Sequence, residues 1–257
     1  MSQSCIIIGA GNLATHLALA LKKNGHDIVQ VYNRSEAPAR ELAKKVNSEY
    51  TTNPYQLKSS ASVFFVAVKD DAFDEVLSKI KLNDKLLIHC SGSTPLSALS
   101  NYSANYGVLY PLQTFSKDRY LDFNKIPIFI ESNSESNLKL MEEIASSLSE
   151  KVFELDSEKR KSLHVAAVFA CNFVNHLYTL AGDVLQEKEI PFYILKPLIA
   201  ETAKKIQDLK PFDAQTGPAV RNDEKIIAKH IESLEDSPEL LNLYISLSKS
   251  IFNHHQK

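Results

Sequence analysis

A glycine-rich segment directly after the first apolar run constrains the fold of this chain more than any other feature. Residues 9–14 read Gly-Ala-Gly-Asn-Leu-Ala, a GxGxxA pattern, and the apolar run 5–8 precedes them. The helical pattern that follows ends with Lys22 and Lys23 before Gly25, as the carboxyl end of a helix commonly does. A short glycine pattern alone is weak evidence, but a strand before it and a helix after it supply the required context. The opening of the chain therefore predicts the first strand, turn and helix of a doubly wound α/β sheet.

Up to residue 155 the chain alternates short β-type runs with helical segments. This alternation is typical of a parallel sheet with crossover helices. The predicted strands cover residues 5–8, 28–32, 63–68, 86–89, 108–110, 126–130 and 152–155. We therefore predict that residues 1–155 form a Rossmann-type domain with a doubly wound, mostly parallel sheet.

The pattern changes after Asp156, where the β-type runs disappear. Segments that contain proline separate long helical patterns over residues 158–188, 192–209, 223–234 and 239–252. Residues 156–257 are therefore predicted to form an all-α domain. The chain as a whole is expected to be an α/β domain followed by a helical one.

The glycine-rich turn has the residues that a phosphate-binding backbone requires. Gly9 permits the tight turn, Gly11 lets a pyrophosphate approach the backbone, and Ala14 lets the helix pack close to the strand. The helix that starts here offers free N–H groups and the positive end of its dipole to phosphates. A dinucleotide cofactor is therefore expected at this turn, in contact with Gly9, Ala10, Gly11, Asn12 and Leu13.

The segment after the second predicted strand indicates which dinucleotide binds. An NAD site usually places a carboxylate there to accept from the ribose 2′-hydroxyl, and FAD sites of this fold carry an acidic residue at the same point. This chain has Asn33, Arg34 and Ser35 instead. Arg34 can pair with a 2′-phosphate and Ser35 can donate to it, whereas a carboxylate would repel that group. The sequence therefore favours NADP(H), although an arginine that is merely solvated in a turn would give the same pattern.

Further loops follow the predicted strands at the edge where sheets of this kind bind ligands. Val68 and Lys69 are expected to contact the cofactor, and Ser91, Gly92 and Gln113 are expected to lie beside the substrate. The Gly, Ser, Asp and Pro residues of these loops are also those that ordinary turns use. Only their position at this edge favours a functional role.

The composition is that of a soluble globular protein, with 44% hydrophobic and 23% charged residues. A formal net charge of −2 does not indicate a nucleic-acid or membrane-surface partner, and no run approaches the roughly 20 apolar residues of a membrane span. Cys5, Cys90 and Cys171 lie far apart and have no metal-binding spacing. No metal site is expected, and the absence of a CxxC pair and of a signal-peptide pattern favours the cytoplasm.

Several segments resemble a known family. The segments 89–92, 110–115, 163–172 and 216–223 are similar to Rossmann-like oxidoreductases with a C-terminal domain of unknown function, number 2520, and together they span nearly the whole chain. The glycine-rich opening and Val-Ala-Val-Lys-Asp-Asp at 66–71 resemble the wider superfamily of 6-phosphogluconate dehydrogenase, β-hydroxyacid dehydrogenases and pyrroline-5-carboxylate reductase. The resemblance implies a helical C-terminal domain like that of 6-phosphogluconate dehydrogenase and a homodimer formed through it. It implies no particular substrate.

The same resemblance indicates where a reaction takes place. In the better-known relatives a lysine on the first long helix of the C-terminal domain faces the nicotinamide, and His164 corresponds to that lysine. An asparagine follows the lysine by one turn, but this chain has Val168 there and Asn172 a turn later. Histidine can give a proton near neutral pH, so His164 and Asn172 are the candidate catalytic residues. The alternatives are a core histidine bonded to backbone and an asparagine that satisfies a buried polar group.

The segment 216–223 supplies a second candidate for substrate contact. Arg221 can bind a carboxylate or phosphate through two parallel hydrogen bonds, and it can equally pair with Asp223 or with a second subunit. Asp223 is expected to cap the helix that follows it. Related chains carry glycine where this one has Asn222, so a stiffer or differently shaped loop is expected.

The sequence therefore predicts an NADP(H)-dependent reductase or dehydrogenase that transfers hydride to or from a small polar or anionic molecule. One alternative is reduction of an imine, as in pyrroline-5-carboxylate reductase. Another is a non-catalytic sensor or scaffold that binds NADP(H), which the missing lysine–asparagine pair favours. A methyltransferase is a more distant alternative, because Arg34 has no evident function there.

Overall fold

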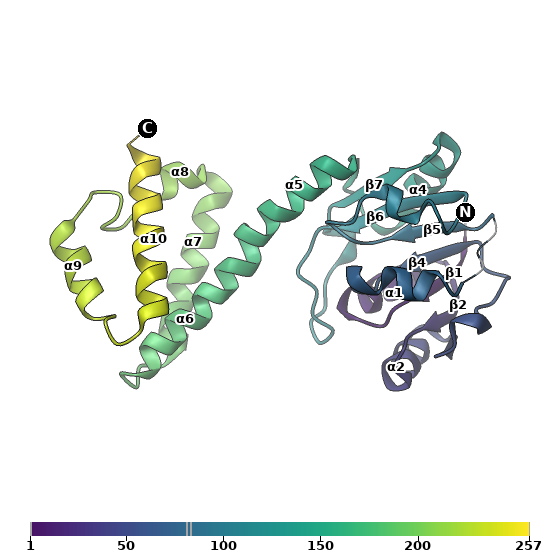
Figure 1. Cartoon of the computed structure of the whole chain (residues 1–257), viewed down its shortest axis with the longest axis horizontal. Helices are drawn as coiled ribbons and strands as arrows, with labels where there is room; N and C mark the ends of the chain where they lie inside the picture. The colour runs from purple at the N-terminus through teal and green to yellow at the C-terminus, as the bar shows by residue number, and fades with distance from the viewer. Residues whose placement is uncertain (1, 81, 83, 257) are drawn as a thin grey trace. The chain divides into compact units, whose positions relative to one another are not determined.

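The computed structural model describes residues 2–80, 82 and 84–256. The chain forms two compact units, residues 1–171 and 172–257. Helix α5 (Ser157–Ala167; labelled in Figure 1) begins just after the expected boundary at residue 155 and belongs to the first unit. It contributes the buried side chain of Arg160 to that unit.

An eight-stranded sheet organises the first unit, with the strand order β3-β2-β1-β4-β5-β6-β7-β8. The strands are β1 (Ser4–Ile8), β2 (Asp27–Tyr32), β3 (Glu49–Thr51), β4 (Val63–Val66), β5 (Leu86–His89), β6 (Asn105–Pro111), β7 (Ile128–Ser132) and β8 (Val152–Glu154). All neighbours run parallel except β6 and β7, which are antiparallel. The strand order reverses between β1 and β4, and a crevice at such a point is where doubly wound sheets bind ligands. The predicted fold class, a mostly parallel sheet followed by a helical region, is confirmed.

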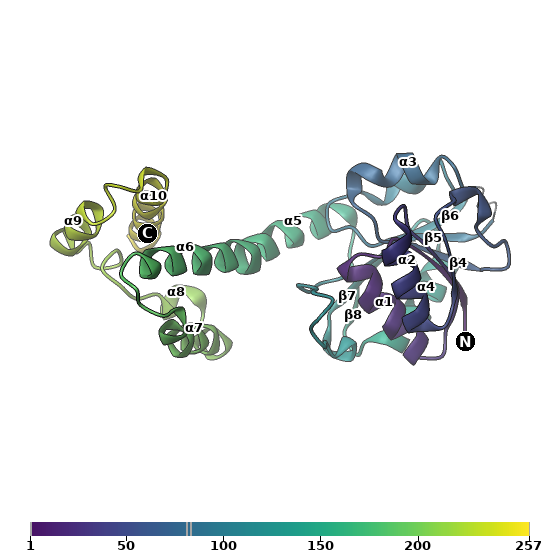
Figure 2. The same cartoon turned by 90° about the horizontal axis from the view of Figure 1, so that it is seen from below.

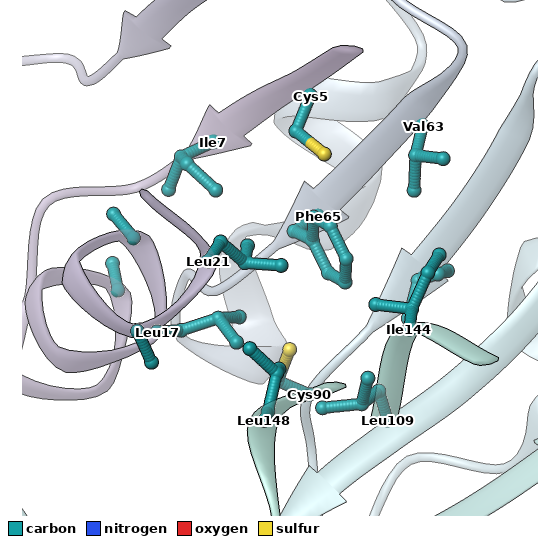
Figure 3. Packing of buried hydrophobic residues seen from close by; sticks show 14 of the residues in the cluster. Cys5, Ile7, Leu17, Leu21, Val63, Phe65, Cys90, Leu109, Ile144 and Leu148 are labelled. Carbon is teal, nitrogen blue, oxygen red and sulfur yellow. The ribbon is translucent and has the colours of Figure 1, made fainter. Parts of the chain in front are cut away.

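Helices cover both faces of the sheet because successive side chains of a strand point to opposite faces. The helices and 3₁₀ turns that precede α5 are α1 (Asn12–Lys23), α2 (Glu36–Val46), η1 (Pro54–Gln56), η2 (Asp70–Ala72), α3 (Phe73–Leu77), η3 (Leu96–Leu99), η4 (Phe123–Lys125) and α4 (Glu135–Leu148). Cys5 and Ile7 of β1 pack in one buried cluster with α1, α2 and α4, part of which Figure 3 shows. Ile6 and Ile8 pack in a second cluster with α3, which lies across the sheet from α1 (Figure 2).

The second unit is entirely helical in its described part. Its elements are α6 (Val174–Gln186), η6 (Phe192–Leu195), α7 (Lys196–Asp208), α8 (Pro211–Ala214), α9 (Glu224–Glu232) and α10 (Pro238–His255). Ala219 is the one buried residue between positions 172 and 256. The apolar side chains of these helices therefore pack against one another only in part.

The first long helix of the chain contains an irregular turn. A π-helical segment, η5 (Val168–Phe173), joins α5 to α6 within a continuous helix Ser157–Gln186, close to the predicted 158–188. A π turn winds more loosely than an α turn and often marks a functional position. Because this turn lies between His164 and Asn172, the two residues are not separated by the ~100° per residue of a regular α-helix. Whether they share a face of the helix therefore does not follow from their spacing in the sequence.

The same helix is long and apolar enough, by length and composition, to cross a membrane. It has 30 residues, and the mean hydropathy of its most apolar window is 1.3. Helices at the core or at an interface of a soluble protein meet the same criterion, so this finding alone assigns no membrane.

Candidate active site

The glycine-rich turn leaves β1 in a conformation that only glycine adopts easily. Gly9 has a φ of +115°, and its N–H donates to the carbonyl of Tyr32 at 2.8 Å. A Cβ atom at this position would lie 2.4 Å from the carbonyl oxygen of Ala67. Gly11, the N-cap residue just before α1, has an ordinary φ of −79°, and a Cβ added there would meet no atom within 4 Å. The turn therefore brings β1 against β4 at Gly9 and leaves open space at Gly11.

A first cavity of about 280 Å³ lies beside this turn, between the ends of β1, β2 and β4. Its lining residues are Gly9, Ala10, Gly11, Tyr32, Asn33, Arg34, Ala67, Val68, Lys69, Ala72, Glu75 and Val76. The Asn33 amide donates to the carbonyl of Ser35 at 3.0 Å, which shapes the loop between β2 and α2. The hydroxyl of Ser35 makes no capping hydrogen bond at the start of α2. Arg34 therefore lines the cavity, and the hydroxyl of Ser35 is not used as a helix cap.

A second cavity of about 360 Å³ lies beside the first. Both cavities are lined by Gly11, Ala67, Val68 and Lys69, so they meet at the glycine-rich turn. The other residues around the second cavity are Asn12, Leu13, Val66, Asp70, Cys90, Ser91, Gly92, Ser93, Tyr110 and His164. The two cavities lie along the carboxyl ends of the strands. An extended dinucleotide could bind with one half in each cavity.

The loop after β5 brings Ser91 and Gly92 to the second cavity. The Ser91 hydroxyl donates to the Asp70 carboxylate at 2.9 Å and accepts the N–H groups of Ser93 and Thr94 at 3.1 and 3.0 Å. A Cβ added to Gly92 would lie 2.6 Å from Cγ of His164. Ser91 therefore shapes the loop, and Gly92 makes room for the imidazole.

His164 meets a residue that the sequence analysis did not select. The hydroxyl oxygen of Tyr110, at the end of β6, lies 2.9 Å from Nδ1 of His164, and the two ring centroids are 5.9 Å apart in an edge-to-face arrangement. Tyr110 is buried, which raises the pKa of its phenol and keeps it protonated. Its position at the carboxyl end of a predicted strand was the signal that could have identified it.

Arg160 fixes the start of the helix that carries His164. Its guanidinium is buried; Nη1 donates to the Glu131 carboxylate at 2.5 Å and Nη2 donates to the carbonyl of Thr94 at 2.6 Å. Ser157 donates to the same carboxylate at 2.8 Å. These contacts tie α5 to β7 and to the loop after β5, one helical turn before His164.

Two further buried groups near the loop after β5 are kept uncharged. Burial and the nearby Arg160 lower the pKa of His89 to about 3, and its Nδ1 accepts the N–H of Ser91 at 3.2 Å. Burial raises the pKa of the Cys90 thiol to about 12. His89 therefore supports the loop as a neutral ring, and Cys90 is not a thiolate nucleophile.

Gln113, Asn172 and Arg221 are not among the residues that line the second cavity. The Gln113 side chain accepts the N–H of Thr114 at 2.8 Å. Asn172 and Arg221 belong to the second unit. In the segment that holds Arg221, Asn222 adopts a φ of +51°, a conformation that asparagine tolerates better than most residues other than glycine. Asp223 accepts the N–H of Ile226 at 3.4 Å and so caps α9 as predicted.

Within residues 2–80, 82 and 84–256, no group of three or more histidine, cysteine, aspartate or glutamate side chains is arranged to hold a metal ion.

The fold and the site together define a class, the oxidoreductases with a Rossmann-type dinucleotide domain. Residues 4–92 match the family model described as NADP oxidoreductase, coenzyme F420-dependent, and residues 126–251 match a domain of unknown function, DUF2520. The protein BF3122 of Bacteroides fragilis, provisionally described as an NADP oxidoreductase, has 47% sequence identity and a TM-score of 0.93, with 98% of each chain covered. The chain belongs to the same family as this protein.

More distant proteins are also similar to this chain, and the solved structures among them share the fold alone. An imine reductase from Myxococcus stipitatus, solved with NADP⁺, has a TM-score of 0.67 at 15% identity, covering 98% of this chain and 93% of the other. A 1-pyrroline-5-carboxylate reductase from Streptococcus pyogenes has a TM-score of 0.64 at 14% identity, covering 97% and 99%. A glutamyl-tRNA reductase from Picosynechococcus is 27% identical over 157 residues, or 59% of this chain, and the chain spans only 35% of that protein. The predicted family is confirmed, and NADP(H) is confirmed as the cofactor at the level of the family.

Proposed function

We propose that this protein is an NADP(H)-dependent oxidoreductase that acts on a small polar or anionic molecule. The observation that carries the proposal is that two neighbouring cavities share lining residues at the glycine-rich turn, and that Arg34 lines the first and His164 the second. When bound, NADP(H) supplies or accepts the hydride. The protein then has to bind the dinucleotide, orient the substrate and exchange a proton.

The residues around the cavities fit NADP(H). The amides of residues 9–13 and the start of α1 suit the pyrophosphate, and the open space at Gly11 lets it approach. Arg34 and Ser35 suit the 2′-phosphate, while Val68 and Lys69 lie where the two cavities meet. His164 lines the second cavity and is proposed as the acid/base group for the substrate. Gly92 lies beside its ring, and Ser91 lines the same cavity from the loop after β5. Arg221 as an anion clamp and Asn172 as a catalytic residue stay predictions from the sequence.

An Arg34→Ala variant is expected to lose the preference for NADPH over NADH. Hydrogen bonds to a charged group contribute about 1.5–3 kcal/mol, so the affinity for NADPH should fall roughly tenfold to a hundredfold while that for NADH changes little. Thermal-shift titrations with both nucleotides measure this. Arg40→Ala is the matched control, because Arg40 is also an exposed arginine, on the following helix α2, but does not line the cavity. A wild-type protein that neither nucleotide stabilises would contradict the proposed function.

Imine reduction is the second candidate reaction, because the fold is shared with imine reductases. Oxidation of NADPH in the presence of carbonyl compounds or of cyclic imines separates the two reactions. A protein that binds NADPH and consumes none with either class would favour the non-catalytic sensor.

We also propose that a second copy of the chain covers the helical unit. Its described part buries only Ala219, whereas large apolar side chains that are at least 38% exposed occur on most of its helices. They include Phe173, Leu177, Tyr193, Ile194, Leu198, Ile206, Phe212, Ile245 and Leu247. Covering these exposed apolar side chains with a second copy would add to the burial that offsets the entropy lost on folding. Lys196, Lys204 and Lys205 on α7 would be costly in the interior of a membrane, so a protein partner suits this surface better.

Light scattering is expected to give twice the chain mass of 28.8 kDa. Leu198→Asp should shift the protein towards monomers and lower its melting temperature, because Leu198 is 64% exposed in the single chain and would be buried by a partner. Lys204→Asp on the same helix is the control, since that position is already charged. A stable wild-type monomer at micromolar concentration, or binding to phospholipid vesicles in place of dimers, would rule the dimer out.

A further inference from the structure

We infer that Tyr110 is a positioning residue for His164, because its hydroxyl holds Nδ1 of the imidazole and leaves Nε2 to meet the substrate. The inference rests on the proposed function, in which His164 exchanges a proton with the substrate. Beyond that role of His164, Tyr110 orients the imidazole, and Nε2 is the atom that exchanges the proton.

Two elements fix the imidazole from different sides. Tyr110, at the end of β6, lies 2.9 Å from Nδ1, and its ring meets the imidazole edge-to-face. The backbone of Gly92 passes so close that a Cβ there would lie 2.6 Å from both Cγ and Nδ1. The Nδ1 edge is therefore enclosed by Tyr110 and Gly92. Among the described residues Nε2 has no protein hydrogen-bond partner, and His164 itself lines the second cavity.

The direction of the hydrogen bond follows from the surroundings of the phenol. Tyr110 is buried, and among the described residues Nδ1 of His164 is the acceptor within hydrogen-bond distance of its hydroxyl. A buried hydroxyl is normally satisfied as a donor. In the neutral ring the Tyr110 O–H therefore donates to Nδ1, and Nε2 carries the ring proton. When the imidazole is doubly protonated, the Tyr110 hydroxyl rotates and accepts a hydrogen bond from Nδ1–H. A hydroxyl can act both as donor and as acceptor, whereas phenylalanine at this position could do neither.

This arrangement gives a balanced proton step for a reduction. The C=O or C=N carbon gains a hydride, its π-bond breaks, and the oxygen or nitrogen takes the proton from Nε2 of the imidazolium. The ring is left for the moment as the neutral tautomer with its proton on Nδ1, which donates to the Tyr110 oxygen. This tautomer differs from the neutral ring of the free protein, which carries its proton on Nε2. Water then returns a proton to Nε2, and the reverse sequence serves an oxidation. The phenol keeps its proton throughout, in agreement with its raised pKa.

Nitrogen-15 NMR of the imidazole tests this inference without any turnover. In the free wild-type protein, at a pH where the ring is neutral, His164 should show a single tautomer protonated at Nε2. Tyr110→Phe should replace it by a mixture of the two tautomers, because the donor to Nδ1 is lost. Tyr106→Phe is the control, since Tyr106 lies on the same strand but packs against the second buried cluster.

A wild-type ring protonated at Nδ1, or a spectrum that Tyr110→Phe leaves unchanged, would overturn the inference. Circular dichroism of Tyr110→Phe shows whether the variant is folded, and if it is not, the wild-type tautomer alone decides. The proposed function fails separately, by the absence of NADPH binding in the thermal-shift titration. A locked tautomer in a protein without NADPH binding would leave the Tyr110 contact in place and remove the reductase.

Discussion

A Gly9→Ala variant is expected to lose NADP(H) binding together with a large part of its folding stability. The added Cβ would lie 2.4 Å from the Ala67 carbonyl oxygen, which is backbone at the end of β4 and cannot move aside easily. The residue would also have to keep a φ of +115°, which an L side chain rarely adopts. Backbone strain and overpacking together cost about 2–4 kcal/mol. Urea unfolding measures the loss of stability, and thermal-shift titration with NADPH measures the loss of binding.

Gly11→Ala is the matched control in the same turn. Gly11 has an ordinary φ of −79°, and a Cβ there meets no atom within 4 Å, so the free energy of unfolding should stay close to that of the wild type. The Cβ would nevertheless occupy the space through which a pyrophosphate approaches the backbone, so NADPH affinity should fall. Equal behaviour of the two variants in both measurements would mean that this turn does not hold the cofactor.

The sequence predicted the parts of the fold that local pattern determines. The glycine-rich turn and the alternation of β-type runs with helical segments predicted the first unit, because both can be recognised from neighbouring residues. Strand β3 was missed because it has three residues, two of them exposed. The antiparallel pairing of β6 and β7 was not predicted either, since strand direction depends on a connection that carries no pattern of its own.

The candidate site was predicted only where it follows from a single segment. Arg34 could be selected because it comes directly after the second strand, and the cavity it lines agrees with that choice. The contacts of Tyr110 and Glu131 could not be predicted, because their partners His164 and Arg160 lie far along the chain and on another element. The position of Tyr110 at the end of a predicted strand indicated only that it lies at the edge of the sheet. Gln113 was selected for its position after a strand, but its side chain bonds to the neighbouring residue. A role that depends on contact between distant segments needs the structure.

An Arg160→Ala variant is expected to be among the least stable single variants of this protein. The Arg160 side chain is 1% exposed and that of Glu131 17%, so loss of the guanidinium leaves a mostly buried carboxylate without its partner. Removing one member of a buried ion pair costs about 3–5 kcal/mol. The variant also frees the Thr94 carbonyl, which joins α5 to the loop beside His164. Urea unfolding should show the loss.

A double variant separates the uncompensated charge from the loss of packing. Because the penalty arises mainly from the buried carboxylate, Arg160→Met with Glu131→Gln should recover part of the stability that Arg160→Met alone loses. Lys159→Ala is the neighbouring control: Lys159 also pairs with a carboxylate, that of Asp156 at 2.9 Å, but its side chain is 73% exposed. Solvent screens such a pair, so this variant should unfold as the wild type does. If Arg160→Ala were as stable as Lys159→Ala, the buried pair would not be what holds α5, and with it His164, against the sheet.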